Sequence, residues 1–444
     1  MEMIKNIASN SSESHEDFRI NQIRTIDVHE DIAGFRKAAY KVFKELPVPS
    51  NKTKVWRKAP FEEFKLDKFD LENISPINKA AANNLFNQFR KEGLSGSAFI
   101  SSSGRNVILN PDLKNQGVIL CDLITAEKEY PQLIAEFMGK IVPPSEDKYS
   151  ALTHAFCQTG LLLYLPKGTG LEKPIYSLFW EEGENRLVVP YILILIDEGA
   201  SATFIQQWAG SGAKKSSNLN CGIVEIQINK GGSLDYIDMQ SWGDSWINIL
   251  HEKVRLLEKG NINWFIYAEG SQYSKTFIKA ELGGRQSSAN LTGVYLPTSH
   301  HQMDFDTYQE HLAPYSKSDL LFKGVVANQG KAVWSGMIKV APNAEKVDAY
   351  QVNRNLTMCG EPNVDSIPGL EILADDVRCS HGVSIGEIDP DQIFYLKSRG
   401  ISEKESRRLI SEGFIQSALI RIYNKDIQTM LTARVHAKLA NLFC

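Results

Sequence analysis

The sequence predicts an all-β core, built as a parallel β-helix, between N-terminal and C-terminal α-helical domains. From Thr159 to about Ala374 the chain is a succession of short runs rich in β-branched and aromatic residues, each ended by a small turn. The glycines of three such turns, Gly199, Gly231 and Gly260, recur about every 30 residues, roughly the length of one β-solenoid coil. No helical pattern separates these runs, which argues against a doubly wound sheet. A β-sandwich with hairpin turns is the competing prediction.

The N-terminal domain, residues 1–158, is predicted to be mixed but mostly helical. Apolar residues recur there at helical spacing in several segments. Prolines on both sides of Trp56 enforce an extended connection between the first two helices. The predicted elements are helices over 34–45, 78–92, 130–138 and 148–156, and a β-hairpin over 97–109.

The core, residues 159–388, is predicted from its strands and from turns that resemble one another. The turn sequences combine a charged or amide residue with glycine, as in Asp197-Glu198-Gly199-Ala200 and Asn229-Lys230-Gly231-Gly232. Such repetition is typical of a stacked-coil architecture. The predicted strands are 161–166, 187–196, 202–208, 223–228, 234–239, 254–257 and 262–267.

The C-terminal domain, residues 389–444, is predicted to be helical. Asp389 is a natural N-cap and Pro390 fits the first helical turn, so a helix should begin there. The two helices that follow, the last of them predicted over 426–442, have wide apolar faces and little else to pack on but each other. Such faces suit a docking surface for another subunit, and a plain helical hairpin is equally consistent with the pattern. The residues expected to form the docking surface are Phe414, Leu419, Met430 and Leu431.

Charge and composition exclude several classes of protein. The 444 residues include 49 Lys and Arg against 53 Asp and Glu, which gives no global footprint for nucleic acid or an anionic membrane. Six cysteines without a C-x-x-C pair do not form a disulfide scaffold and fit a reducing compartment. We find no secretory signal and no apolar run long enough to span a bilayer. The expected location is the cytoplasm, without nucleic-acid or membrane partners.

Cys379 and His381 lie two residues apart, beside the joint between the core and the helical tail. If this segment is extended, the two side chains project from the same face and can reach one metal ion or one partner surface together. A thiolate and an imidazole are suitable ligands for iron. The alternative is a buried structural cysteine and a hydrogen-bonded histidine at a strand end. Because two ligands are too few for a closed metal site, a site here needs a second chain.

A second histidine group, His300, His301 and His311, lies near Asp304 and Asp306. Its spacing fits no known ligand motif, so we predict a polar, solvent-facing turn. The sequence contains no nucleophile elbow, no phosphate-binding loop and no dinucleotide fingerprint. We therefore expect a protein that is not an enzyme.

Several segments carry a resemblance to a known family. The most specific is 375–400, which contains Cys-Ser-His-Gly at 379–382. Over about residues 56–413 the chain resembles the SufB/SufD family, the scaffold subunits of the SUF iron–sulfur cluster assembly machine. The resemblance implies that the parallel β-helix is right-handed. The other matching segments are 171–174, 323–327, 330–336 and 351–356, together with Trp56, Lys58 and Pro60.

Within this family the sequence is most similar to the SufD pattern. SufB-type chains carry an essential cysteine upstream of the signature and a glutamate just after its histidine, and here those positions are Asn353 and Gly382. The resemblance implies pairing with SufB through the β-helices and binding of a SufC ATPase through the C-terminal helices. It maps His381 and the adjacent Cys379 onto the nascent cluster site at the SufB–SufD interface, as candidate iron ligands.

The expected function is that of a non-catalytic scaffold subunit of the SufBCD complex, with a role in iron acquisition. No cofactor is expected to bind tightly to the chain alone, and a transient iron or iron–sulfur cluster is expected in the complex. The sequence leaves open whether the chain is a homodimer when SufB is absent. One alternative is a SufB-like scaffold acting as a homodimer. Another is a secreted β-helix carbohydrate-active enzyme, which the missing signal peptide and missing catalytic cluster disfavour.

Overall fold

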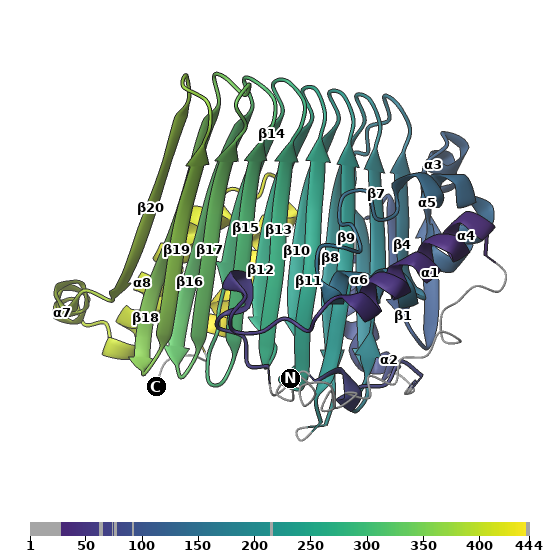
Figure 1. Ribbon diagram of the computed structural model, residues 1–444. Helices are drawn as coiled ribbons and strands as arrows, with labels where there is room; N and C mark the ends of the chain where they lie inside the picture. Colours follow the sequence, from purple (N-terminus) through teal and green to yellow (C-terminus); the bar gives the residue numbers. More distant parts are fainter. Residues whose placement is uncertain are drawn as a thin grey trace, which may run out of the picture.

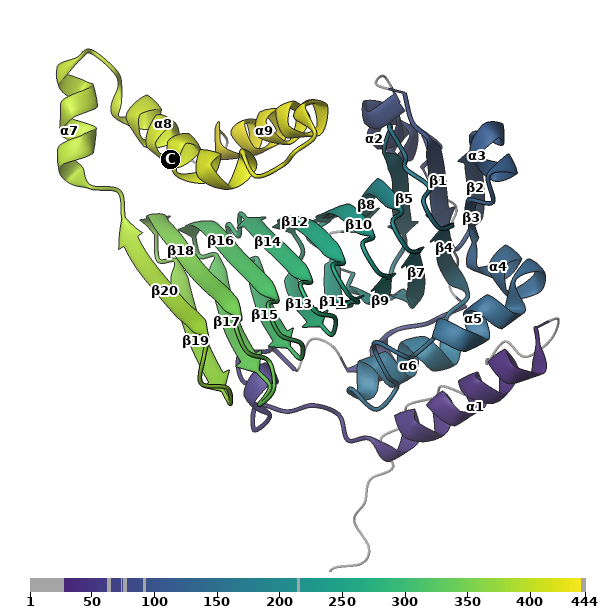
Figure 2. The same cartoon turned by 90° about the horizontal axis from the view of Figure 1, so that it is seen from above.

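The structure is a computed structural model of the chain, and it describes residues 28–61, 65–72, 74, 78–90, 93–213 and 216–440. The described residues form a β-solenoid with helices against its outer faces (Figures 1 and 2). The predicted all-β core, a parallel β-helix with helical flanks, is thus confirmed. Among the described residues, none of the helices is both long and apolar enough to cross a membrane.

The strands of the described residues form two sheets. In spatial order, the first contains β2 (Gly104–Leu109), β1 (Gly96–Ser101), β5 (Ile175–Glu182), β8 (Ser201–Ser211), β10 (Ser233–Trp242), β12 (Asn261–Gly270), β14 (Ser288–Tyr295), β16 (Lys317–Asn328), β18 (Asp348–Gly360) and β20 (Arg378–Glu387). The second contains β19 (Asn363–Ile372), β17 (Lys331–Val340), β15 (Gln302–His311), β13 (Tyr273–Leu282), β11 (Trp246–Leu256), β9 (Asn218–Ile228), β7 (Pro190–Ile196), β4 (Thr159–Leu165) and β3 (Ile119–Asp122), with β6 (Leu187–Val188) beside β9.

From β7 onward, consecutive strands alternate between the two sheets. Each strand pairs in parallel with the strand two positions later, so that Tyr236 of β10 lies beside Trp264 of β12. This pairing stacks one coil on the next, whereas a hairpin sandwich would pair consecutive strands antiparallel. In the described part of the chain, only β1–β2 and β3–β4 are antiparallel pairs. The sandwich alternative is therefore excluded.

One corner of seven successive coils is made by a residue with left-handed backbone geometry. Gly168, Gly199 and Gly231 have φ angles of 72°, 66° and 64°, a region that glycine adopts without strain. Each of the seven corner residues donates its backbone N–H to a carbonyl on the following coil, and we call this column the corner ladder. The donors and acceptors are Gly168 to Glu198, Gly199 to Lys230, Gly231 to Glu258, Lys259 to Arg285, Gln286 to Pro314, Tyr315 to Glu345 and Lys346 to Asp376.

The helices cover the outer faces of both sheets. Apolar residues of α1 and α6 pack on the second sheet around Ile249 and Tyr273, and α8 and α9 cover the first sheet. The helices and helical turns are α1 (Glu30–Glu45), η2 (Lys54–Trp56), η3 (Leu66–Lys68), α2 (Lys79–Arg90), α3 (Pro111–Asn115), α4 (Leu123–Glu129), α5 (Pro131–Phe137), α6 (Lys148–Phe156), α7 (Pro390–Ser398), α8 (Glu403–Leu419) and α9 (Lys425–Ala440).

The predicted helices and the β-hairpin appear close to their expected limits, but the strand predicted over 254–257 is only the end of β11, and β5 was not predicted. The helix predicted over 34–45 begins earlier, at Glu30, and the end of the helix predicted over 426–442 lies outside the described residues. The strand β4 begins at Thr159, where the core was predicted to begin, and α7 begins at Pro390. However, β1, β2 and β3 precede residue 159 and extend the two sheets, so the division into three domains stays a prediction.

A buried polar network interrupts the apolar interior of the solenoid. Asp238 of β10 and Glu252 of β11 are fully buried and close enough for the charge of Asp238 to act on Glu252. Asp238 accepts hydrogen bonds from Trp208 Nε1 at 2.8 Å and Gln240 Nε2 at 2.7 Å, and Glu252 accepts one from the Tyr236 hydroxyl at 2.7 Å. Burial raises the pKa of Asp238 to about 7, and burial together with the charge of Asp238 raises the pKa of Glu252 well above its usual value. The pair therefore keeps a proton at neutral pH.

The raised pKa values predict that alkaline pH destabilises the solenoid. Between the unfolded and folded pKa values, the folded chain binds more protons than the unfolded chain, so stability falls as pH rises. Glu252→Gln removes the carboxyl that stays protonated. We expect the stability of the variant relative to wild type to increase with pH by up to about 1.4 kcal/mol per pH unit. Urea unfolding at about pH 5, 7 and 8 measures this slope, with the exposed Glu361→Gln as control. Parallel pH curves for Glu252→Gln and wild type would contradict the prediction.

Candidate functional site

The solenoid is closed at one end and open at the other. At its N-terminal end, the short strands β2 and β3 run antiparallel to β1 and β4 and cover them. At the C-terminal end, β20 pairs with β18 and β19 with β17, and neither has a further partner strand in the described residues (Figure 1). Two ten-residue strands thus present unpaired backbone edges, which are templates for pairing with another chain. We call this the open end.

Cys379 and His381 lie at the open end and face the interior of the solenoid. In the β18–β20 register, Cys379 lies beside Ala349 and His381 beside Gln351. Ala349 and Gln351 are buried interior residues, at 2% and 0% exposure. Side chains in register share a face, so the thiol and the imidazole both point into the interior, about 7 Å apart along the strand. Because no further coil covers them, His381 is exposed and Cys379 is half-buried.

The structure decides against a hydrogen-bonded core histidine at position 381. No hydrogen bond connects His381 to any described residue, and the ring is open to solvent. Burial, and then the charge of Asp348, raise the pKa of the Cys379 thiol, so the free chain carries a neutral thiol there. Among the described residues, no group of three or more His, Cys, Asp and Glu side chains is placed to hold a metal ion. At this end of the chain, Cys379 and His381 can supply two ligands to a metal ion, and the described residues supply none for its remaining coordination positions.

An apolar rim surrounds the pair. Val383 and Ile385 follow His381 on the same interior face of β20, and Ile385 is 48% exposed. Across the solenoid, Leu370 and Ile372 end the interior face of β19, and Leu373 follows at 52% exposure. In the preceding coil, buried residues occupy the positions beside both strands, so these five side chains form an uncovered section through the interior. The buried residues are Ile338 and Val340 beside β19, and Asn353 and Asn355 beside β20. A surface of this kind marks a protein–protein contact.

Asn353 lies behind the rim, in the wall of the same interior. Its side chain is fully buried and donates to the Tyr295 hydroxyl at 2.8 Å. Its Oδ1 accepts from Asn355 Nδ2 at 2.7 Å and from the Ser366 hydroxyl at 2.5 Å. The side-chain amide of Asn353 is thus held in hydrogen bonds within the interior. Unlike a cysteine at this position, it provides no thiol ligand near the open end. Gly382 is on the outer face of β20, beside Val352.

The C-terminal helices correct the predicted docking surface. Leu419 and Leu431 are fully buried, because α8 and α9 lie on an apolar part of the first sheet that includes Phe265 and Leu321. Phe414 and Met430 are partly buried against the same cluster. The expectation that the two helices have little else to pack on but each other is therefore wrong. Sequence periodicity identifies an apolar face and does not tell what covers it.

The helix α7 carries the apolar residues that the sequence analysis missed. Phe394 is 72% exposed and Tyr395 58%, while Ile393 on the other side of the helix is buried. Figure 2 shows α7 standing away from the solenoid, beyond β20 and beside α8. The sequence does contain a signal for this exposed surface. The nine-residue helix has two adjacent aromatic residues, Phe394 and Tyr395, beside its one buried residue, Ile393.

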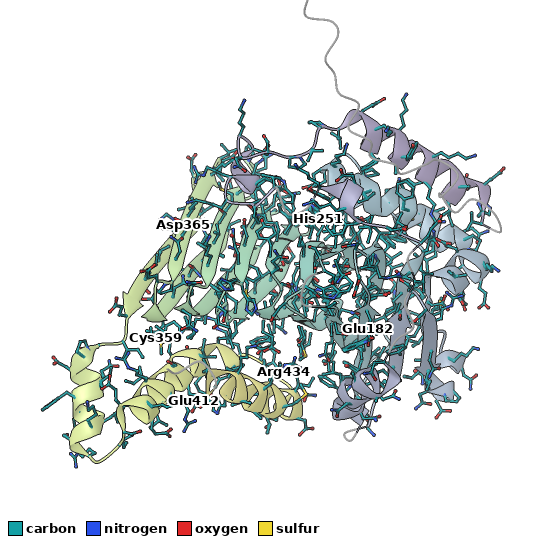
Figure 3. All side chains as sticks on the ribbon, turned by 90° about the horizontal axis from the view of Figure 1, so that it is seen from below. Glu182, His251, Cys359, Asp365, Glu412 and Arg434 are labelled. Carbon is teal, nitrogen blue, oxygen red and sulfur yellow. The ribbon has the colours of Figure 1, made fainter. Side chains whose placement is uncertain are left out.

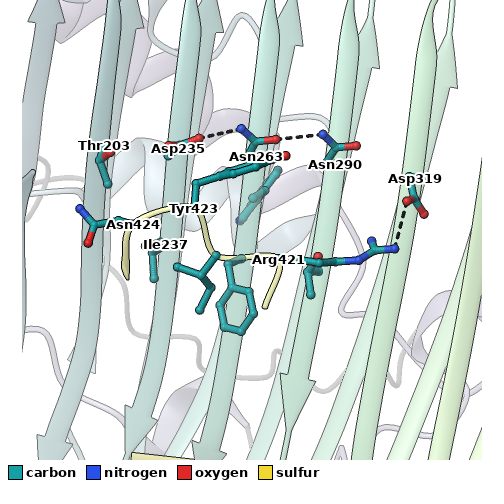
Figure 4. Close-up of a pocket in the computed structure, with 13 residues that line it drawn as sticks. Thr203, Asp235, Ile237, Asn263, Asn290, Asp319, Arg421, Tyr423 and Asn424 are labelled. Atoms are coloured by element: carbon teal, nitrogen blue, oxygen red, sulfur yellow. Dashed lines mark hydrogen bonds and ion pairs between the residues drawn. The ribbon is translucent and has the colours of Figure 1, made fainter. Parts of the chain in front are cut away.

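The loop between α8 and α9 fixes the helices to the first sheet. Arg421 pairs with Asp319 of β16 across 3.0 Å, and α9 contributes Arg434, paired with Glu269 across 2.6 Å. Beneath the loop is a small cavity of about 180 Å³, partly covered by Tyr423 (Figure 4). Its floor is a row of polar side chains in register on five neighbouring strands: Thr203, Asp235, Asn263, Asn290 and Asp319.

The second histidine group does not form one site. His311 is buried, with its two ring nitrogens at 2.8 Å from the hydroxyls of Ser316 and Ser318, and burial lowers its pKa to about 4. His301 is also buried, and its Nε2 lies 2.9 Å from Asp244. The predicted solvent-facing turn is correct for His300 alone, because the other two histidines belong to the interior and to a loop contact.

Comparison with known proteins matches this fold and this end of the chain to one family. A model described as the SUF system FeS cluster assembly, SufBD core domain, matches residues 179–414, and a SufBD N-terminal region model matches residues 19–176. The chain belongs to the SufBD family. The core match includes β20 with Cys379 and His381, and also α7 and most of α8.

Curated relatives agree with the family and do not separate its subtypes. The iron–sulfur cluster assembly protein SufB of Bacillus subtilis is 28% identical over 308 residues, covering 69% of this chain and 66% of the relative. An iron–sulfur cluster assembly SufBD family protein of Staphylococcus epidermidis is 27% identical over the same length and shares. The match thus spans slightly less than two thirds of each relative's length. Both similarities concern cluster assembly, and neither distinguishes SufB from SufD.

The exposure of His381 predicts that its substitution leaves stability unchanged. His381→Ala removes no hydrogen bond to a described residue and leaves no cavity, so the unfolding free energy should change by less than about 0.5 kcal/mol. The matched control is His311→Ala, which orphans two buried hydroxyls and should cost about 1–3 kcal/mol. Thermal melting of the two variants tests the contrast. A comparable loss of stability in both would show that His381 is a structural residue.

Proposed function

We propose that this chain is a non-catalytic scaffold subunit of the SUF system, of the SufD type, which assembles iron–sulfur clusters with a second scaffold subunit. The observation that carries the proposal is the open end, where a thiol and an imidazole face an uncovered section through the interior. A transient iron or iron–sulfur cluster is the cargo, and the chain alone holds no cofactor tightly. Holding iron at this end is the part the chain takes in iron acquisition.

The incomplete ligand set supports a site shared between two chains. Cys379 and His381 supply two ligands, and iron–sulfur clusters are commonly held by more. The neutral thiol loses its proton only when a metal binds, so ligation and proton release are coupled. The alternation along β20 directs both ligands toward whatever covers the open end. A partner that closes the solenoid therefore completes the ligand set at the same time.

The partner proposed for the open end is SufB, joined through the β-helices. The unpaired edges of β19 and β20 supply backbone hydrogen-bonding groups, and the apolar rim supplies area to bury. Asn353 supports the SufD assignment, because a satisfied amide stands where SufB-type chains are expected to carry a cysteine. In this division of roles the partner supplies the second thiol, and this chain supplies the imidazole.

A SufC ATPase is proposed to bind at α7 and the adjoining side of α8. Phe394 and Tyr395 provide aromatic anchors of the kind that dominate binding energy in interfaces. Leu409 of α8 is also exposed. This places the ATPase contact next to the strand that carries His381, since α7 follows β20 after two residues, Ile388 and Asp389.

Loss of the imidazole should abolish cluster assembly in the complex. Full-length His381→Ala, co-expressed with SufB and SufC, should form the complex and contain little iron and sulfide, because alanine removes a ligand and leaves the strand edge intact. Cys379→Ser should cause a milder loss, since a shared site can recruit another sulfur more easily than another imidazole. Iron and sulfide per complex are the measured quantities, and the exposed His300→Ala is the control. Wild-type cluster content in His381→Ala would end the case for this site.

Loss of the aromatic pair on α7 should release the ATPase. Phe394→Ser and Tyr395→Ser should each weaken SufC binding by about 2 kcal/mol or more, as expected for interface anchors. Melting temperature should not change, because both rings are exposed. The control is Tyr423→Ser, an equally exposed aromatic residue on the loop between α8 and α9. Binding constants from titration of SufC that are equal for all three variants would place the contact elsewhere.

A further inference from the structure

A segment of the N-terminal part crosses the outer face of the second sheet. This strap, residues 46–58, runs across the sheet on the way from α1 to the open half of the solenoid (Figure 1). Lys148 Nζ donates to the Leu46 carbonyl at 3.0 Å, and Lys58 pairs with Asp365 of β19 across 2.8 Å. Trp56, which is 1% exposed, packs on Phe277 with ring centroids 5.5 Å apart. Contacts within the chain therefore fix the strap at both ends.

The strap encloses a cavity against the sheet, which we call the strap cavity. Its volume is about 550 Å³, within the range of small-molecule sites. Trp56 from the strap and Phe277 and Tyr308 from the sheet line it with aromatic rings. Figure 3 shows two residues of this region, His251 on β11 and Asp365 at the far end of the strap, across the solenoid from the C-terminal helices. The strap cavity is therefore separate from the open end and from α7.

Of the described carboxylates that line the strap cavity, Asp306 is the one without an ion pair. Lys253 pairs with Glu146 across 2.6 Å, Lys279 pairs with Glu310 across 2.5 Å, and His251 Nε2 lies 3.1 Å from Asp147. Asp306 has no hydrogen bond or ion pair to any described residue. The nearby Lys275 donates to Asp304 instead, at 2.7 Å.

Asp306 remains largely ionised at neutral pH despite its surroundings. Burial raises its pKa to about 6, and the nearby Lys275 limits the rise. Asp306 is half-buried, and a partly desolvated carboxylate attracts an opposite charge more strongly than a carboxylate in open water does. The strap cavity therefore combines an aromatic lining with one unsatisfied negative charge.

We propose that the strap cavity binds a small organic cation, a primary ammonium or guanidinium group carried on an apolar body. Asp306 is the counter-ion, and the partly exposed rings of Phe277 and Tyr308 contact the apolar body of the ligand and its cationic group. The lysines that line the cavity, Lys148, Lys253 and Lys279, already donate to a backbone carbonyl or a carboxylate, so an anionic ligand would have to compete with these contacts. A neutral ligand of the same shape leaves Asp306 without a partner. The proposal does not depend on the scaffold function, because none of these residues lies at the open end or on α7.

The test uses three probes of similar shape and different charge on the full-length protein. Tyramine carries an ammonium group, 4-ethylphenol is neutral, and 3-(4-hydroxyphenyl)propionate is anionic. Isothermal titration near neutral pH should show saturable binding of tyramine, at least about tenfold tighter than binding of 4-ethylphenol, and no binding of the anion. Agmatine should bind as well if the site accepts guanidinium. Absence of saturable binding of both amines up to about 10 mM overturns the proposal, and so does equal affinity for tyramine and 4-ethylphenol.

Two variants assign the binding to the strap cavity. Asp306→Asn should weaken tyramine binding by at least about tenfold and leave 4-ethylphenol unaffected. Tyr308→Leu should weaken tyramine binding about threefold through loss of the aromatic face. The control is Asp348→Asn, which removes an exposed carboxylate on the other sheet and should change nothing. Tyramine affinity that is unchanged in Asp306→Asn, or in Tyr308→Leu if the first variant does not fold, refutes the assignment.

Discussion

A stacked coil is stable only when another layer covers it, and this requirement governs the molecule. Each coil exposes a section through its core and two rows of backbone hydrogen-bonding groups. Within the solenoid the next coil satisfies both, and at the N-terminal end β2 and β3 do so. At the C-terminal end nothing in the described residues does. The thiol of Cys379 and the imidazole of His381 lie on this uncovered section, so in the proposed function covering the end and completing a ligand set are one event.

The apolar outer faces of the two sheets also need to be covered, and different elements cover each of them. The first sheet has an apolar part, which α8 and α9 cover, and a polar part, where Asp235, Asn263 and Asn290 hydrogen-bond along their row. The second sheet is covered by α1, α6 and the strap. The strap leaves a gap because its prolines keep the chain extended above the sheet, where a helix would have filled the space. The helices therefore pack closely against the sheets, whereas the extended strap leaves a cavity between itself and the second sheet.

The sequence predicted the features that follow from local periodicity, which are the coils and the faces of strands and helices. It did not predict which elements, distant in sequence, pack against those faces. The recurring glycines Gly199 and Gly231 predicted the coils because glycine adopts the left-handed corner without strain. The later corners, which other residue types make, left no such signal in the sequence. The i, i+2 spacing predicted that Cys379 and His381 share a face. Periodicity also found the apolar faces of α8 and α9, but Leu419 and Leu431 are buried because a sheet distant in sequence covers them. The exposure of Phe394 and the unmatched charge of Asp306 likewise follow from long-range neighbours that no local pattern records.

The corner ladder has a consequence for how such a molecule can change its length during evolution. Successive ladder residues are separated by intervals that vary from coil to coil, yet every link joins one turn to the next in the same way. Coils of different length therefore differ at positions other than this corner, and the hydrogen bonds of the corner ladder are the same from coil to coil. A whole coil can therefore be duplicated or lost as a unit, which moves the two ends apart or together in steps of about 4.8 Å without altering either. The number of coils therefore sets the distance between the capped end and the end that carries Cys379 and His381, and evolution can change this distance one coil at a time.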